Sequence, residues 1–245
     1  MADLGGWPLL TWCAERLKTV QDGAATVVVA TSTNQDDDRI ASHTTLSLPG
    51  TILVRGDAAD VLSRFALALA TTDSPLIVRV TGDCPLIDPG IIDAACELVA
   101  STGADYASTS IDGRFARGLD VEVMTRAALE RAVNESTTEE HHEHVTPFIY
   151  QNPDIFKCVA VPAPSWAAHP NIRITVDEAE DLELLRHVVA QLAPTTPTAL
   201  SARSVVEHLR ANPGLASLNS AVEHRIVRNV AHERHSASTE GTNRT

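Results

Sequence analysis

The fold is decided by one stretch, residues 75–88, which read PLIVRVTGDCPLID. Its first six residues form an apolar run, which is typical of a strand buried on both faces of a parallel sheet. The run breaks at Gly82, presents one acid, Asp83, and leads into a predicted helix with Asp88 as its N-cap. Because open α/β sheets bind ligands outside the carboxyl ends of their strands, Asp83 is predicted to lie at a ligand site.

On both sides of this stretch, short apolar runs alternate with amphipathic segments, which predicts an α/β domain. We expect strands at residues 26–31, 52–54, 75–80, 104–108, 119–124, 155–161 and 172–176, and helices at residues 8–20, 57–69, 89–100, 125–133, 178–192 and 201–210. Residues 1–212 are assigned to one domain, and the polar segment 213–245 is predicted to be disordered.

Composition excludes several classes of protein. The net charge is −13, so the surface offers no electrostatic footprint for nucleic acid or for an anionic membrane. The four cysteines lack metal-binding or disulfide spacing, which indicates reduced thiols in the cytoplasm. The sequence has neither a run of about 18 apolar residues nor a secretory signal, so no membrane segment is predicted.

Two acids follow predicted strands and precede predicted helices, Asp83 and Asp177. In one largely parallel sheet both would face the same crevice, and two carboxylates with water and phosphate oxygens suit Mg²⁺. The alternative is structural, because Asp83 would serve equally well as a turn residue and Asp177 as a helix N-cap. Spacing alone leaves this choice open.

Other polar clusters favour structural interpretations. Residues 36–38 are three consecutive aspartates, which we interpret as the acidic first turn of a helix and not as a metal site. His141 and His142 lack HExxH spacing, and adjacent residues point about 100° apart on a helix. We therefore predict that these two histidines lie on a solvated helix surface.

Six segments carry a resemblance to a known family: VVVATSTNQDDD, VRGDAADVLSRF, VRVTGDCPLID, GLDVEV, EHVTPFIY and NIRITVDEAEDLELL. In this order they resemble the SpsF-like cytidylyltransferases of spore coat polysaccharide biosynthesis. More distantly they resemble the synthetases that make CMP-acylneuraminate and CMP-3-deoxy-manno-octulosonate. The resemblance spans about residues 4–223. It implies a three-layer α/β nucleotide-diphospho-sugar transferase fold with a mostly parallel central sheet.

The resemblance also implies a reaction and a set of sites. CMP would pass from CTP to a sugar or sugar acid with release of pyrophosphate, with Mg²⁺ as cofactor and a homodimer as the expected assembly. The metal ligands would be Asp83 and Asp177, with Arg173 as a further catalytic residue. The implied nucleotide-binding residues are Thr31, Arg64, Arg79, Thr81 and Gly82, and the implied substrate-binding residues are Asp120, Glu122, His144 and Thr146.

Two of these assignments have a structural alternative. Arg64 would also fit an ordinary helix surface, and Arg173 would also fit a cross-strand ion pair with Glu122. Thr81 stands where the distant relatives carry a base-contacting glutamine, which leaves the nucleobase unassigned.

The chain departs from the family pattern at its start. Family members begin with a strand and a basic loop, RxGSxRxPGK, that cradles the triphosphate. Here the resemblance starts only at Leu4, and Trp7 stands where relatives usually carry lysine before proline. We expect the N-terminal strand to be missing from the sheet.

Two explanations stay open for this departure. The start codon was placed about 20 to 40 residues too late, or the protein is a degenerate, non-catalytic member that binds a sugar or a partner protein. A dehydrogenase is disfavoured, because no GxGxxG follows an early strand.

Overall fold

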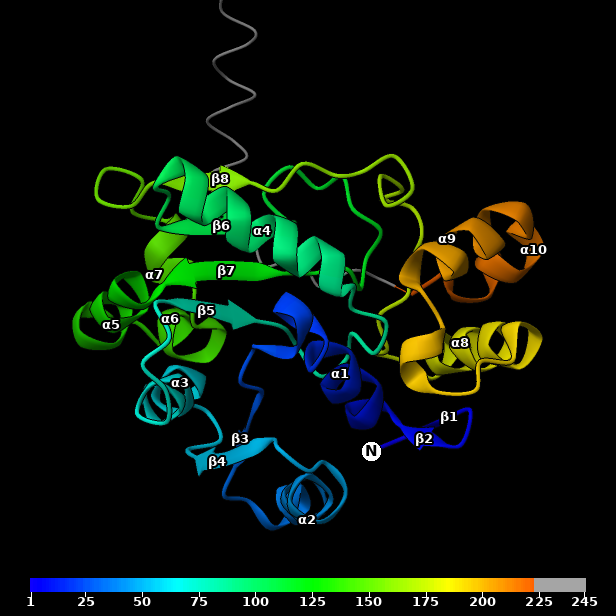
Figure 1. Cartoon of the computed structure of the whole chain (residues 1–245), viewed down its shortest axis with the longest axis horizontal. Helices are drawn as coiled ribbons and strands as arrows, with labels where there is room; N and C mark the ends of the chain where they lie inside the picture. The colour runs from blue at the N-terminus through cyan, green and yellow to red at the C-terminus, as the bar shows by residue number, and fades with distance from the viewer. Residues whose placement is uncertain (223–245) are drawn as a thin grey trace, which may run out of the picture.

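The computed structural model describes residues 1–222 (Figure 1). Its strands are β1 (Asp3–Leu4), β2 (Trp7–Pro8), β3 (Val28–Ser32), β4 (Ile52–Gly56), β5 (Leu76–Arg79), β6 (Tyr106–Ser108), β7 (Glu122–Thr125) and β8 (Cys158–Ala160). Its α-helices are α1 (Leu9–Leu17), α2 (Asp38–Ser47), α3 (Val61–Leu69), α4 (Pro89–Thr102), α5 (Arg126–Glu135), α6 (Glu139–His144), α7 (Pro147–Tyr150), α8 (Ala179–Leu192), α9 (Ala202–Ala211) and α10 (Pro213–Ala216). The predicted α/β class is confirmed.

The strands form two separate sheets and one small hairpin. The larger sheet has the order β5-β7-β6-β8, in which β7 is antiparallel to both of its neighbours and β6 is parallel to β8. Three of its strands, β5, β6 and β8, therefore run in one direction. The second sheet is the parallel pair β3-β4, and β1 pairs with β2 as an antiparallel hairpin.

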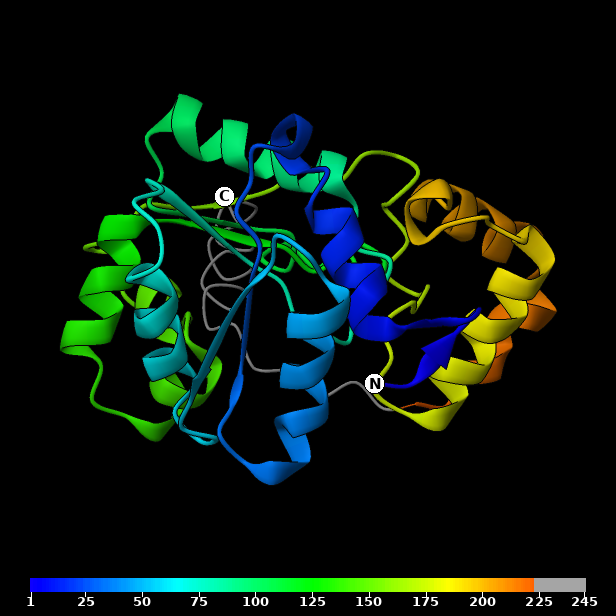
Figure 2. The same ribbon diagram turned by 60° about the horizontal axis from the view of Figure 1, so that its bottom comes forward.

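Helices cover both faces of the larger sheet. Alternate side chains along each strand point to opposite faces, so each strand contributes side chains to the packing on both sides. Ala107 and Val123 belong to one core cluster with residues of α1, α4, α8 and α9. Their chain neighbours Tyr106 and Met124 belong to a second cluster with residues of α3, α5 and α7. Figure 2 shows α4 on one side of the sheet and α5 on the other. These layers give the predicted three-layer arrangement.

Buried Arg16 of α1 ties the N-terminal helix to the loop that carries Asp83. Its guanidinium donates from Nε to the carbonyl oxygen of Ile87 at 2.6 Å and from Nη1 to that of Leu200 at 2.6 Å. Only 3% of Arg16 is exposed. The helix that follows the loop begins as predicted, since the Asp88 side chain accepts from the backbone N–H of Ile91. Both interactions therefore hold the carboxyl-terminal end of the loop.

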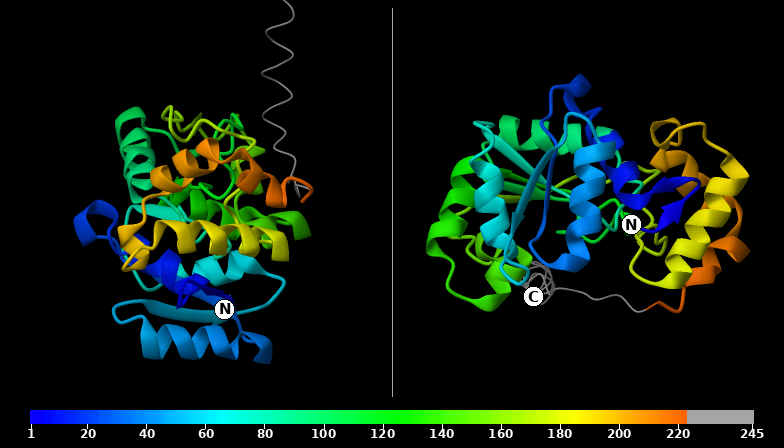
Figure 3. Two further views of the ribbon diagram at one scale, coloured as in Figure 1. Left: turned by 90° about the vertical axis from the view of Figure 1, so that its right-hand side faces the viewer. Right: turned by 90° about the horizontal axis from the view of Figure 1, so that it is seen from below.

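Helices α8, α9 and α10 lie together beside the β1-β2 hairpin (Figure 3). The boundary predicted at residue 212 falls inside this group, because α10 and a 3-10 helix, Ser217–Asn219, continue the fold. Asn219 is 3% exposed and bonds to residues of the candidate site. Residues 213–222 are thus folded, contrary to the prediction. The rest of the predicted tail, residues 223–245, lies outside the described part.

The predicted strand at residues 172–176 does not form. This segment is extended, but its backbone hydrogen bonds go to two loops. Arg117 N–H donates to the carbonyl oxygen of Ile172, and Ile174 N–H donates to that of Arg117. Val176 N–H donates to the carbonyl oxygen of Asp83. Only an isolated bridge between Arg117 and Arg173 resembles sheet pairing. The strand prediction was wrong because the segment spans between loops and has no neighbouring strand to pair with.

Gly118 allows this segment to come close. It has φ +98°, and a Cβ there would lie 2.5 Å from the backbone nitrogen of Thr175. Only glycine fits both the backbone angle and the close approach.

Candidate active site

Asp83 and Asp177 come together at the carboxyl end of β5. The backbone beside each acid is joined directly: Val176 N–H donates to the carbonyl oxygen of Asp83 at 2.8 Å, and Thr175 Oγ1 donates to the same oxygen at 3.1 Å. The two carboxyl groups are close enough to interact. Burial and the Asp83 carboxyl raise the pKa of Asp177, although Arg173 acts in the opposite direction. Two adjacent carboxylates of this kind favour a bound cation.

Arg173 holds Asp177 in place. Its Nη2 lies 2.5 Å from Asp177 Oδ2. Its guanidinium also donates to Asp181, from Nε to Oδ1 at 2.8 Å and from Nη2 to Oδ2 at 2.9 Å. The hydrogen bonds that Arg173 donates to Asp181 raise the pKa of Arg173 far above its ordinary value, more than burial lowers it. Arg173 therefore stays charged and fixes the orientation of the Asp177 carboxylate.

Asp181 and Asn219 complete this network and were not predicted. Asp181 is fully buried, and its Oδ2 also accepts from the backbone N–H groups of Asp177 and Glu178. Asn219 Nδ2 donates to Asp181 Oδ1 at 2.8 Å and to the Arg173 carbonyl oxygen at 3.1 Å. Burial alone would raise the pKa of Asp181, but these bonds lower it.

The helix cap at α8 settles the structural alternative for Asp177. The N-cap of α8 is Glu178, which forms a capping box with Asp181, so Asp177 does not cap the helix. The spacing of Glu178 and Asp181 in the sequence is typical of a capping box. No comparable sequence sign marked Asn219, which reaches the site from a segment assigned to the tail.

A second polar cluster centres on Glu122 of β7. Glu122 pairs with Arg79, which lies opposite it in the β5-β7 register. Tyr106 Oη donates to Glu122 Oε1 at 2.5 Å and Thr146 Oγ1 donates to the same oxygen at 2.6 Å. The alternative ion pair between Glu122 and Arg173 is wrong, because each has other partners.

Two of the remaining predicted residues, Thr31 and Asp120, make side-chain hydrogen bonds of their own. Thr31 donates through Oγ1 to Asp37 Oδ2 at 2.9 Å, and Asp37 also accepts from the Ser32 hydroxyl. Asp120 Oδ2 accepts from the N–H of Gly118 at 2.8 Å. The Asp37 carboxylate thus binds the last two residues of β3, Thr31 and Ser32. Helix α2 begins at the next residue, Asp38, as the helix-start interpretation of the three aspartates predicts.

Arg64 and His144 lie on helices. Arg64 in α3 has a buried Nε without a hydrogen-bond partner in the described part of the chain, which sets it apart from an ordinary surface arginine. His144 is the last residue of α6 and is half-buried.

The histidines before it are not simply solvated, contrary to the prediction. His142 Nδ1 lies 3.0 Å from Asp60 Oδ1, and His141 Nε2 lies 3.1 Å from Gln151 Oε1. Both side chains are half-buried because α6 packs against α3.

The donor set at Asp83 and Asp177 fits Mg²⁺. Residues 1–222 contain no group of three or more histidine, cysteine or acidic side chains arranged for a metal ion. Mg²⁺ does not need one, because it is usually held by one or two carboxylates and completes its shell with waters and substrate phosphates. Soft-metal chemistry is disfavoured, because the nearby Cys84 thiol is buried and its pKa is raised well above the ordinary value by burial and by Asp83.

A family model described as cytidylyltransferase matches residues 1–220. This chain belongs to the cytidylyltransferase family. An uncharacterised protein of Methanocaldococcus jannaschii is 32% identical over 93% of this chain and 90% of its own length. The spore coat polysaccharide biosynthesis protein SpsF of Bacillus subtilis is 29% identical over 80% of this chain and 79% of its own.

Among solved structures, a cytidylyltransferase from Leptospira borgpetersenii matches with a TM-score of 0.80 and 28% identity, covering 91% of this chain and 90% of the other. The match confirms the predicted nucleotidyltransferase-like α/β fold. Of the helices in residues 1–222, none combines the length and apolar character needed to cross a bilayer.

Proposed function

We propose that the protein is a cytidylyltransferase that makes an activated sugar. A hydroxyl or acid oxygen of a sugar or sugar acid attacks the α-phosphorus of CTP, the bond from that phosphorus to the bridging oxygen breaks, and pyrophosphate leaves. The observation that carries this proposal is the meeting of Asp83 and Asp177 at the end of β5 in a member of this family. The similarity to SpsF, whose name refers to polysaccharide biosynthesis, supports a sugar acceptor.

Asp83 and Asp177 are the residues that would hold Mg²⁺, which neutralises charge on the nucleotide phosphates when bound. Arg173, itself held by Asp181, fixes the orientation of the Asp177 side chain. The hydrogen bonds from Thr175 and Val176 fix the backbone of Asp83. The Asp177 carboxylate and the backbone of Asp83 are thus in place before any ligand arrives, which lowers the cost of forming the site.

Residues of strands, loops and helices would contact the substrates. We assign Thr31, Arg64, Thr81 and Gly82 to the nucleotide, and Asp120 and His144 to the acceptor. Arg79 and Thr146 each bond to Glu122, so we assign these three residues to the polar floor of the site. The four free cysteines are in keeping with a reaction in the cytoplasm, where CTP is made.

Binding of CTP with Mg²⁺ tests the metal assignment. In isothermal titration calorimetry the 245-residue chain should bind CTP more tightly with Mg²⁺ than without it, and Asp83→Asn should weaken the Mg²⁺-dependent binding at least tenfold. The control is Asp73→Asn, which removes an exposed acid outside the site.

A folding control accompanies this measurement. Metal-free Asp83→Asn should melt at the same temperature as the unaltered protein or about 1 to 2 °C higher, because the change relieves repulsion between two carboxylates. Equal Mg²⁺-dependent binding in both proteins would contradict the assignment.

Release of pyrophosphate tests turnover. The proposed reaction predicts that the protein with CTP, Mg²⁺ and a panel of sugars and sugar acids releases pyrophosphate with at least one acceptor, and that Asp83→Ala abolishes this release. The measurement is a coupled pyrophosphate assay. No release with any acceptor, or release that survives Asp83→Ala, would contradict the proposal.

A further inference from the structure

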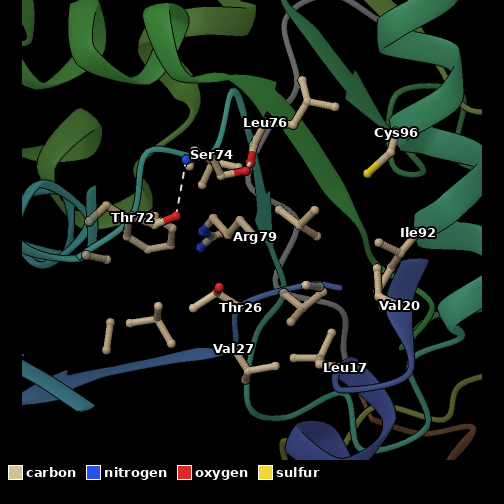
Figure 4. A pocket seen from close by; sticks show the side chains of 18 of the residues that line it. Leu17, Val20, Thr26, Val27, Thr72, Ser74, Leu76, Arg79, Ile92 and Cys96 are labelled. Atoms are coloured by element: carbon tan, nitrogen blue, oxygen red, sulfur yellow. Dashed lines mark hydrogen bonds between the residues drawn. The ribbon is translucent and has the colours of Figure 1, made fainter. Parts of the chain in front are cut away.

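A surface cavity of about 450 Å³ lies where residues 168–172 meet helices α9 and α10. It is separate from the larger cavity between β3 and β5, which lies where the family pattern places its N-terminal strand (Figure 4). None of the residues assigned to Mg²⁺, the nucleotide or the acceptor lines the smaller cavity. Its volume is within the range that holds a small molecule. The protein therefore has a second place for a ligand, outside the candidate active site.

The charged groups that line this cavity are basic. Among its described lining residues, only Arg210 and His169 carry or can gain a charge, and no acid lines it. Arg210 forms no hydrogen bond or ion pair within residues 1–222, whereas Arg203 of the same helix pairs with Glu207 at 2.7 Å. In a chain with a net charge of −13, the cavity is thus a local site of positive charge that an anion would neutralise.

The imidazole of His169 has hydrogen-bonding capacity that the described chain does not use. Its Nε2 is buried and has no hydrogen-bond partner within residues 1–222. Buried polar atoms are almost always hydrogen-bonded, so this nitrogen calls for an explanation. Burial and the charge of Arg210 both lower the pKa of His169, which shows that the two side chains are close enough to interact. An anion beside both would accept from each of them and remove their repulsion.

The rest of the lining is mostly apolar. It comprises Ala168, Pro170, Ile172, Leu209, Pro213 and Ala216, with Asn171 and Ser217 as further polar residues. Leu209 is buried in the main core cluster, and Ile172 and Ala216 pack against that cluster. An inorganic anion would leave this apolar surface uncovered. An anionic group on a compact apolar body would cover it.

We propose that this cavity binds a small organic anion, with a carboxylate or phosphate group beside Arg210 and His169 and an apolar body against Ile172 and Leu209. The guanidinium of an arginine binds either group through its fork of N–H donors. The proposal goes beyond the nucleotidyl transfer reaction, because it concerns a different cavity and a different ligand.

The cavity adjoins the network that supports the candidate active site. Ile172 immediately precedes Arg173 in the chain, and Ser217 belongs to the same 3-10 helix as Asn219. Asn219 in turn donates to the Arg173 carbonyl oxygen and to Asp181. A ligand in the cavity would therefore contact both of the segments that meet in this network.

Isothermal titration calorimetry of the 245-residue chain, without Mg²⁺ or nucleotide, tests the proposal with three probes. Benzoate and phenyl phosphate carry the two anionic groups on the same apolar ring, and benzamide has the shape of benzoate without its charge. At least one of the two anions should bind with a Kd of about 1 mM, as expected for so small a ligand. Benzamide should bind at least tenfold more weakly. The anion that binds more tightly identifies the preferred group.

A matched pair of variants on α9 locates the anion. Arg210→Met keeps a long side chain but removes the charge, and it should weaken anion binding at least tenfold. Arg203→Met removes an arginine that points to Glu207 and does not line the cavity, and it should leave anion binding unchanged. Both positions are exposed, so both variants should fold, which circular dichroism verifies.

Proton uptake tests the part played by His169. A bound anion removes the repulsion from Arg210 and so raises the pKa of His169, and binding at about pH 6.5, the ordinary pKa of histidine, should take up protons. The uptake is measured as the dependence of the binding enthalpy on the ionisation enthalpy of the buffer. His169→Asn should abolish it, and the difference between the two proteins isolates the histidine from any titration of the probe.

Four results would each overturn the proposal: no binding of either anion, equally tight binding of benzamide, unchanged anion binding in folded Arg210→Met, or the same proton uptake in His169→Asn as in the unaltered protein. None of these measurements uses CTP or Mg²⁺, so the proposed function is tested separately.

Discussion

Asp181→Ala is expected to lower the free energy of unfolding by about 3 to 5 kcal/mol, the usual cost of removing one partner of a buried ion pair. Asp181 is fully buried and accepts two bonds from the guanidinium of Arg173, which is 6% exposed. Its loss takes away the fully buried partner that neutralises that charge. It also leaves the N–H groups of Asp177 and Glu178 without an acceptor. Urea unfolding followed by circular dichroism measures the change.

The control for this variant is Glu183→Ala on the same helix. Glu183 has a side chain that is 65% exposed, and its contact with His187 is 3.8 Å long, so its removal should change the free energy of unfolding by less than about 0.5 kcal/mol. Asp181→Asn keeps part of the hydrogen bonding and should fall between the two. A loss below about 1 kcal/mol for Asp181→Ala would show that the network does not hold the site together.

The paired acids of the site could be predicted from the sequence because their cause is local. Asp83 follows an apolar run and a glycine, and Asp177 precedes a helix, so each position was readable without its partner. The bonds between the two backbones then bring them together. The place of Asp83 after β5 and of Asp177 before α8 is short-range information that the sequence contains, whereas their role as metal ligands is implied only by the family resemblance.

The support around Asp177 could not be predicted in the same way. Residues 172–176 alternate like a strand, so Arg173 was expected to have a cross-strand alternative partner in Glu122. In the structure its partners are Asp177 and Asp181, four and eight positions further along the chain. Asn219 arrives from the far end of the described chain. Only the packing of α10 and the following turn reveals that contact.

The separation of the two sheets could be predicted from the family resemblance but not from the apolar periodicity of the sequence. Every strand that does form has its own apolar run, and nothing in those runs marks a missing neighbour. The family pattern alone predicted that a strand between them is absent from residues 1–245.

Glu122→Ala is expected to lower the free energy of unfolding by about 2 to 4 kcal/mol. Glu122 neutralises Arg79, whose side chain is 20% exposed, and accepts from the hydroxyls of Tyr106 and Thr146. Burial and the Glu122 carboxylate raise the pKa of Tyr106 well above its ordinary value, so that hydroxyl stays protonated and donates. Removal of the carboxylate leaves one charge and two donors without their acceptor. Urea unfolding again measures the loss.

A double-variant cycle separates the charge from the packing at this position. Arg79→Leu combined with Glu122→Leu removes both charges and should be more stable than Glu122→Ala alone, because no buried charge is left without its partner. Glu122→Gln keeps an acceptor for Tyr106 and Thr146 and should lose less than Glu122→Ala. Glu130→Ala, which removes an exposed glutamate from α5, is the matched control and should cost less than about 0.5 kcal/mol. If the double variant is no more stable than Glu122→Ala, the ion pair is not the cause of the loss, and Arg79 and Glu122 are better explained as substrate contacts than as the floor beneath them.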